Sequence, residues 1–162
     1  MWANALDLDL YKRLRSLARS PETVRWVRRY STVGEHAAGW LALGAAGALV
    51  DPRRRSRWAR ATVCVGASYA TSSSIKIAIG RKRPVIENLP KLMATPTGLS
   101  FPSSHATSSF AAARAFGTLL PSAPLYCAAT AMAFSRLYLG VHYPSDVAAG
   151  AALGTLLGSL GR

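Results

Sequence analysis

Five apolar segments rich in small residues constrain the fold of this chain more than any other feature. They cover residues 35–50, 60–79, 105–120, 122–140 and 145–161, and each is near the length that an α-helix needs to cross a bilayer. Ala, Gly, Ser and Thr are frequent in them, most clearly in the last one, AAGAALGTLLGSLG. Small residues favour helices that pack closely on each other. We therefore expect an all-α polytopic membrane bundle of about five transmembrane helices.

A soluble helical bundle is the alternative fold, because the mean hydropathy of the chain is only +0.16. Several segments nevertheless lack any charged face that water could cover, which favours the membrane bundle. The length of 162 residues fits a single domain. Within it we expect residues 34–162 to form the transmembrane core and residues 1–33 to form an interfacial segment.

The first 20 residues have the pattern of an amphipathic helix that lies on a membrane surface. Apolar and basic side chains alternate along it: Leu6, Leu10, Leu14 and Leu17, with Lys12, Arg13, Arg15 and Arg19 between them. Acidic residues occur early, and there is neither a continuous apolar run nor an evident cleavage site. The pattern therefore argues against a signal peptide.

The basic residues are segregated along the chain. Twenty Lys and Arg face seven Asp and Glu, a net charge of +13 that in a soluble protein would suggest nucleic acid. Seven of the basic residues lie in 1–33 and five in 51–60, with few in the apolar segments. Such clusters are typical of chains beside anionic lipid. We expect the lipid bilayer of the plasma membrane as a partner, and no nucleic acid.

Consecutive helical hairpins would bring three polar parts of the chain to one membrane face. These are the N-terminus, the long Pro- and Gly-rich connection 80–104 and the connection 135–146. The connection 51–59, Pro121 and the C-terminus would lie at the other face. The first face has more basic residues, and basic loops tend to stay in the cytoplasm. We therefore expect the first face to be cytoplasmic.

The first polar cluster on that face is KIAIGRKRP, residues 76–84. Lys76 and Arg83 are seven residues apart, so on a helix they would share one side. A lysine inside an apolar segment usually faces a polar cavity; the alternative is a lysine whose ammonium reaches the membrane surface. We interpret Arg81 and Lys82 as interfacial charges.

The second cluster is FPSSH, residues 101–105, where a turn leads into a helix. Ser103 and Ser104 would lie at the helix N-terminus, whose free N–H groups bind anions. An ordinary N-cap is the alternative for the serines, and a structural histidine is the alternative for His105.

The third cluster is SRLYLGVHYPSD, residues 135–146. His142 and Asp146 are four apart, so the carboxylate could accept a hydrogen bond from the imidazole and make its other nitrogen a better nucleophile. Pro144 interrupts a continuous helix, so this contact needs a favourable turn. Arg136 adds a planar charged group suited to phosphate. The alternative is an interfacial salt bridge between Arg136 and Asp146.

Together the three clusters form a set of cations and helix N–H groups for an anion, with two imidazoles. No cluster of carboxylates is present that could hold a metal ion, so two-metal chemistry is not expected. The residues favour phosphoryl transfer through a covalent phosphohistidine, with neither metal nor cofactor.

The three clusters, in this order, resemble the motifs K-x6-RP, PSGH and SR-x5-H-x3-D of the type 2 phosphatidic acid phosphatase superfamily. The resemblance implies that His142 is the nucleophile, that Asp146 holds its ring and that His105 protonates the leaving group and then activates water. It also implies a set of phosphate-binding residues: Lys76, Arg83, Ser103, Ser104 and Arg136. Ser104 replaces the glycine of the family motif. A serine at this position requires a negative φ, or strain that the structure tolerates.

The chain is similar to compact members of this superfamily that act on polyprenyl-phosphate-linked sugars. Phosphatidic acid, phosphatidylglycerophosphate and undecaprenyl diphosphate are alternative substrates. Two other kinds of protein would use a similar set of residues. One is a catalytically silent protein that binds anionic lipid head groups, against which the paired imidazoles argue. The other is a vanadate-dependent peroxidase, against which the short, apolar chain argues.

Overall fold

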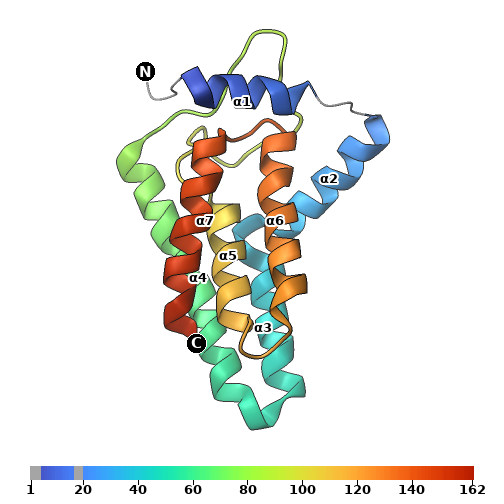
Figure 1. Cartoon of the computed structure of the whole chain (residues 1–162). Coiled ribbons are helices and arrows are strands. Elements are labelled where there is room, and N and C mark those ends of the chain that lie inside the picture. The colour runs from blue at the N-terminus through green and yellow to red at the C-terminus, as the bar shows by residue number, and fades with distance from the viewer. Residues whose placement is uncertain (1–4, 17–19) are drawn as a thin grey trace.

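The computed structural model describes residues 5–16 and 20–162, and within these ranges the fold is all-α, as predicted (Figure 1). The helices are α1 (Ala5–Arg15), α2 (Pro21–Val33), η1 (Glu35–Ala37), α3 (Ala38–Val50), η2 (Pro52–Arg54), α4 (Arg55–Ile79), α5 (Ser104–Phe116), α6 (Ser122–Tyr138), α7 (Pro144–Gly158) and η3 (Ser159–Gly161). The five apolar segments correspond to α3–α7. No helix within the described ranges combines the length and hydropathy that crossing a membrane takes, so the predicted number of spans is not confirmed.

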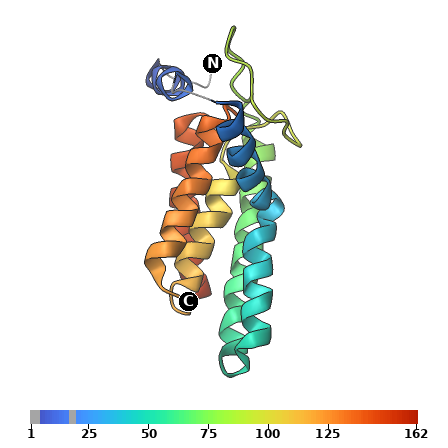
Figure 2. The same ribbon diagram turned by 90° about the vertical axis from the view of Figure 1, so that its right-hand side faces the viewer.

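Helix α5 is the centre of the bundle and packs against α4, α6 and α7. Figure 2 shows α3 and α4 as a pair beside the group of α5, α6 and α7. The main apolar core joins the two groups, and in it the rings of Trp58 and Phe116 lie 5.5 Å apart. The α3–α4 and α5–α6 connections are at the end of the bundle away from α1 (Figure 1).

Glycines in α7 bring this helix unusually close to α5. A Cβ atom at Gly150 would lie 2.6 Å from the carbonyl oxygen of Ser103, and one at Gly154 would lie 2.1 Å from that of Thr107. The close packing expected from the small residues of the last segment is therefore found. As a result the N-termini of the two helices meet, and the Ser103 N–H donates to the Asp146 carbonyl at 3.0 Å.

The three polar parts of the chain lie at one end of the bundle, as the hairpin arrangement predicts. Figure 1 shows α1, the 80–104 connection and the α6–α7 connection at the same end. The long connection folds back on itself, with the Arg83 N–H donating to the Gly98 carbonyl and the Ser100 N–H to the Arg81 carbonyl. Both ends of this connection are thereby fixed beside α5.

The N-terminal segment contains two helices, whereas the sequence predicts only one. Ser20 and Pro21 start the second helix: the Ser20 side chain accepts from the Thr23 N–H, and proline is favoured in a first helical turn. Leu17 and Arg19, which belong to the predicted amphipathic pattern, lie outside the described residues.

Helix α1 turns its polar side toward the protein. Asp7, Tyr11 and Arg15 are buried, while Leu6 and Leu10 are exposed. The Tyr11 hydroxyl donates to the Gly140 carbonyl and Arg15 donates to the Tyr138 carbonyl. The sequence suggests that Arg15 belongs to the charged face of an amphipathic helix. The structure instead buries Arg15, because it donates to a carbonyl group at the end of α6.

Candidate active site

A cavity of about 240 Å³ lies at the end of the bundle where the three sequence clusters meet. We call it the inner pocket. It is lined by Glu35, His36, Tyr69, Ser73, Lys76, Ile77, Arg83, Pro96, Thr97, Leu99, Ser104, His105 and His142. Five of the eight predicted site residues belong to this lining. The other three, Ser103, Arg136 and Asp146, are buried but are not part of it.

His142 lies in the turn between α6 and α7 and is almost fully buried. Its Nε2 atom is 3.1 Å from Nη1 of Arg83. Since a guanidinium only donates, Nε2 must accept, and the ring proton is then on Nδ1. Nδ1 faces Oδ2 of Asp146 at 3.4 Å, longer than an ordinary hydrogen bond. The lone pair of Nε2 therefore points toward Arg83.

The surroundings of the His142 imidazole favour its neutral form. Burial lowers the pKa of His142 well below the usual 6.5, and the positive charges of Arg83 and Arg136 lower it further. A neutral ring keeps its Nε2 lone pair available for attack on an electrophile.

Lys76 and Arg83 of the first cluster are held by carbonyl oxygens. Lys76 Nζ donates to the Pro102 carbonyl at 2.6 Å, and its buried position argues against the alternative of an ammonium at the membrane surface. Arg83 donates to the Val141 carbonyl at 2.7 Å. Burial lowers the pKa of Arg83 to about 10, so it stays protonated at pH 7. Carbonyl groups orient the cations without neutralising them, which leaves their charge for an anion.

The two serines of the second cluster have different positions. Ser103 is the N-cap of α5, and its side chain accepts from the Ala106 N–H; this agrees with the N-cap alternative. Ser104 is the first residue of α5 and lines the inner pocket. It is not among the described non-glycine residues with positive φ. The serine therefore meets the backbone requirement that its replacement of glycine imposes.

His105, the second residue of α5, lines the inner pocket. Its Nε2 atom is buried and has no hydrogen-bond partner among the described residues. The junction between α2 and α3 packs directly on the ring, since a Cβ atom at Gly34 would lie 2.9 Å from His105 Cδ2. A buried, unpaired ring nitrogen in a polar pocket is suited to a proton exchanged with a bound molecule.

Arg136 is buried behind the inner pocket. Its Nη1 atom donates to the Ser31 hydroxyl and to Sδ of Met93, the latter at 3.4 Å. The alternative of an ion pair with Asp146 does not hold, because the carboxylate of Asp146 pairs with Arg81. Arg136 still acts on the site through its charge, as the lowered pKa of His142 reflects.

Arg81 is buried and pairs with two carboxylates, so its interpretation as an interfacial charge is wrong. It is 5 % exposed, and its Nη1 atom donates to Oδ1 of Asp146 at 2.7 Å. Its Nη2 atom donates to Oδ2 of Asp7 at 2.6 Å, and its guanidinium lies over the ring of Tyr143. Gly80 is the physical reason: it ends α4 with φ of +69°, and this turn directs the next residue inward.

Residues 57–161 match the sequence model described as PAP2 superfamily. The chain belongs to this superfamily. It is 42 % identical to the decaprenylphosphoryl-5-phosphoribose phosphatase of Mycobacterium tuberculosis, over 90 % of this chain and 82 % of the relative. The Mycolicibacterium smegmatis protein of the same name is 43 % identical, over 83 % of this chain and 75 % of the relative. The expectation of a phosphatase is confirmed by the family and by the names of these relatives.

Two solved structures have the same fold. Aquifex aeolicus LpxE superposes with a TM-score of 0.84 at 24 % identity, covering 98 % of this chain and 95 % of the other. The transmembrane PAP2 type phosphatidylglycerolphosphate phosphatase of Bacillus subtilis superposes with a TM-score of 0.80 at 22 % identity, covering 99 % and 86 %. The all-α architecture is therefore that of membrane PAP2 phosphatases.

In this PAP2 phosphatase we predict that Arg81 positions Asp146. Arg81→Gln should lower kcat by about 10- to 100-fold with little change in KM, since a small shift of a reacting group is enough to slow a reaction by this factor and Arg81 does not line the inner pocket. Loss of its positive charge should also raise the pKa of His142, so the acid limb of kcat/KM should move to higher pH. Steady-state phosphate release across a pH series checks both effects.

Lys82→Gln is the matched control for Arg81→Gln, because Lys82 is the next residue, carries the same charge and is exposed. Asp7→Asn is a milder second variant, which removes the negative charge that pairs with Arg81 and accepts from Ser145, and it should lower kcat less. If the Arg81→Gln protein has the same kcat as the Lys82→Gln protein, and the same acid limb in its pH profile of kcat/KM, then Arg81 does not position Asp146.

Proposed function

We propose that this chain hydrolyses a phosphomonoester of a membrane lipid without a metal ion, through a phosphohistidine at His142. One observation carries the proposal: Nε2 of His142 accepts from Arg83 while Nδ1 faces Asp146. This arrangement presents an unprotonated nitrogen beside a guanidinium, which suits attack on a phosphate whose oxygens the guanidinium binds.

The first step forms the phosphohistidine. Lys76 and Arg83 bind the phosphate oxygens, with Ser104 and the N-terminus of α5 beside them. Nε2 of His142 attacks phosphorus, and the bond from phosphorus to the lipid alcohol oxygen breaks. The leaving oxygen takes the electron pair and a proton from His105. The carboxylate of Asp146 stabilises the positive charge that His142 then carries.

The second step releases phosphate. A water molecule attacks the phosphorus of the phosphohistidine and gives a proton to His105. The bond between phosphorus and Nε2 breaks, and its electron pair returns to the imidazole of His142. Inorganic phosphate leaves, and His105 is again protonated for the next turnover.

We propose a polyprenyl-phosphate-linked sugar phosphate, decaprenylphosphoryl-5-phosphoribose, as the substrate. The support is the name of the two mycobacterial relatives, which the chain matches over most of its length. Phosphatidic acid, phosphatidylglycerophosphate and undecaprenyl diphosphate are the lipids against which this choice is tested.

The test is phosphate release by the purified chain from these four lipids in detergent micelles. We expect the highest kcat/KM with decaprenylphosphoryl-5-phosphoribose, full activity in EDTA and inhibition by orthovanadate, which adopts the trigonal-bipyramidal geometry of the transition state. A higher kcat/KM with another of the four lipids would contradict the substrate. Loss of activity in EDTA would instead contradict the metal-independent reaction.

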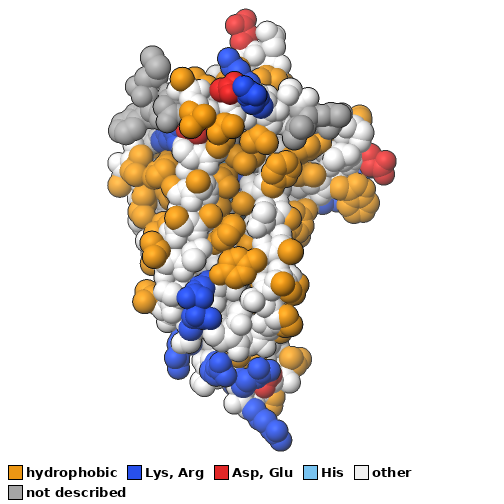
Figure 3. Space-filling model, in the orientation of Figure 1, with side chains coloured by type: hydrophobic (Ala, Val, Ile, Leu, Met, Phe, Trp, Pro, Cys, Tyr) orange, Lys and Arg blue, Asp and Glu red, His pale blue; other side chains and the backbone are white. Residues whose placement is uncertain are grey.

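We also propose that α3–α7 are embedded in the plasma membrane and that the inner pocket opens at the cytoplasmic face. Figure 3 shows apolar side chains along the flank of the bundle. Val63 of α4, Phe134 of α6 and Leu156 of α7 are exposed. The exposed Leu6 and Leu10 would face the membrane surface. Recovery in the membrane fraction is expected. A Lys91→Cys variant labelled in intact cells by an impermeant maleimide, above the wild-type background, would contradict the cytoplasmic orientation.

A further inference from the structure

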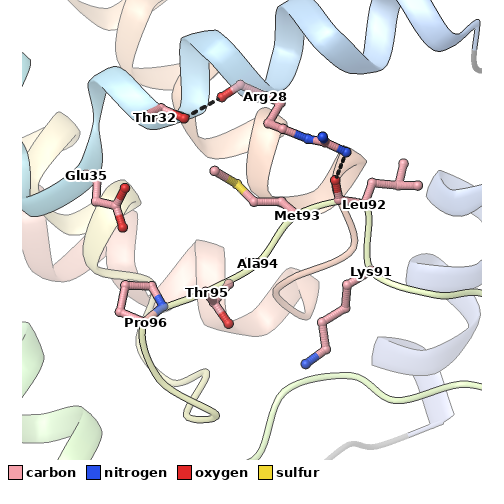
Figure 4. A pocket seen from close by; sticks show the side chains of 9 residues that line it. All are labelled: Arg28, Thr32, Glu35, Lys91, Leu92, Met93, Ala94, Thr95 and Pro96. Carbon is pink, nitrogen blue, oxygen red and sulfur yellow. Dashed lines mark hydrogen bonds between the residues drawn. The ribbon is translucent and has the colours of Figure 1, made fainter.

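A second, larger cavity lies beside the inner pocket. We call it the outer pocket; its volume is about 890 Å³, within the range of ligand sites. Arg28, Thr32 and Glu35 line one side of it and residues 91–96 the other. Figure 4 shows Glu35 at one end, with Lys91 and the Arg28 guanidinium toward the other. None of the predicted phosphate-binding residues lines this cavity.

The outer pocket continues the inner one, because Glu35 and Pro96 line both. The inner pocket has about 240 Å³ against about 890 Å³ for the outer one, so a lipid substrate whose phosphate is bound by Lys76 and Arg83 extends beyond the inner pocket. The part of a substrate next to the reacting phosphate therefore passes Glu35, and the following part lies in the outer pocket.

The 91–96 segment and the turn at His36 form the boundary of the two cavities. Arg28 donates to the Leu92 carbonyl at 2.5 Å, and Arg136 contacts Sδ of Met93, so α2 and α6 both fix the 91–96 segment. On the other side, His36 and Ala37 both have positive φ, a backbone conformation that non-glycine residues adopt at a cost and that is often found at functional sites. This turn places Glu35 and His36 in the lining of the inner pocket.

The charges along this path select a particular chemistry. A carboxylate beside a phosphate site repels a second anion, but it accepts hydrogen bonds from hydroxyl groups. Beyond Glu35, the exposed Lys91 supplies a cation, and Arg28 a second one. The order from the inner pocket outward is thus a site for a phosphate, an acceptor for hydroxyls and then a second site for an anion.

We infer that the outer pocket recognises a phosphodiester joined to the reacting phosphate through a hydroxylated spacer such as a sugar. Glu35 accepts from the hydroxyls of the spacer, and Lys91, with Arg28, binds the phosphodiester. The inference rests on the proposed function and adds the residues that select the substrate. Phosphatidic acid has neither a free hydroxyl nor a second phosphate, so it lacks both features.

The test compares two substrates in the full-length protein: decaprenylphosphoryl-5-phosphoribose and phosphatidic acid. The measured quantity is the ratio of their kcat/KM values. Lys91→Gln should lower this ratio about tenfold, equivalent to ~1.4 kcal/mol, through a higher KM for the lipid with two phosphates. Glu35→Gln should lower the ratio as well, because the hydroxyls of the spacer lose their carboxylate acceptor, whereas removal of the negative charge affects the reacting phosphate of both lipids alike.

Lys82→Gln is the control, because it removes an exposed charge of the same connection outside both pockets. It should leave the ratio unchanged. Equal effects of Lys91→Gln and Glu35→Gln on the two substrates, or an effect of Lys82→Gln as large as theirs, would overturn the inference. A wild-type protein that releases no phosphate from either lipid would instead contradict the proposed function.

Discussion

The His142→Ala protein is expected to release no measurable phosphate from any lipid phosphate, with kcat lowered by roughly 10⁴-fold or more, the scale found when a covalent catalyst loses its nucleophile. The variant lacks the Nε2 atom that Arg83 contacts, and no other imidazole nitrogen has the Asp146 carboxylate behind it. Phosphate release and acid-labile, alkali-stable phosphate bound to the protein after rapid quenching are the two measurements.

His105→Ala is the matched variant, because it removes the second imidazole of the same pocket. With p-nitrophenyl phosphate, whose leaving group needs no proton, it should still form the phosphohistidine. The His142→Ala protein should form none with any substrate. A folded His142→Ala protein with wild-type activity, or protein-bound phosphate in it, would be incompatible with the assignment of His142 as nucleophile.

The sequence predicts those features that local patterns determine. The small-residue segments predict α3–α7, since close helix packing needs such residues all along a helix. The spacing of His142 and Asp146 predicts their contact, and Pro144 does not prevent it because proline is tolerated in the first turn of α7. Motif order and hairpin topology then predict that the clusters meet at one end of the bundle.

The contacts of Arg81 could not be predicted in this way. In the sequence it is equivalent to the neighbouring Lys82, and its partner Asp7 is 74 residues away. Only the left-handed turn at Gly80 and the docking of α1 distinguish the two cations. In the sequence, Gly80 is the signal that sets Arg81 apart, because a glycine that ends a helix often reverses the direction of the chain.

Arg136 and Ser103 illustrate a second limit of the sequence. Their motifs predict residues near a phosphate, but a motif does not predict which neighbouring groups already use their hydrogen bonds. Arg136 donates to Ser31 of α2, a helix that the sequence does not predict. The Ser103 hydroxyl is used by the start of its own helix. Burial behind the pocket, rather than in its lining, follows from these contacts.

Gly154→Ala is expected to destabilise the protein and to lower its activity together. The new Cβ atom would lie 2.1 Å from the Thr107 carbonyl oxygen, so α5 and α7 must move apart, and overpacking of this kind typically costs about 1–3 kcal/mol or more. The same movement separates Ser103 from Asp146. The start of α5, which carries His105, then moves away from the start of α7, which carries the Asp146 carboxylate. Thermal unfolding in detergent and phosphate release measure the two effects.

Gly66→Ala is the matched control and should change stability in the opposite direction. A Cβ atom at Gly66 of α4 would meet its nearest neighbour, Leu41 Cδ2, at 3.9 Å, an ordinary contact. Alanine is a better helix former than glycine by up to about 1 kcal/mol, so this variant should unfold at a higher temperature. A loss of stability in both variants would point to a general intolerance of the bundle to larger residues. Opposite shifts, with activity lost only in Gly154→Ala, would tie catalysis to the close approach of α5 and α7.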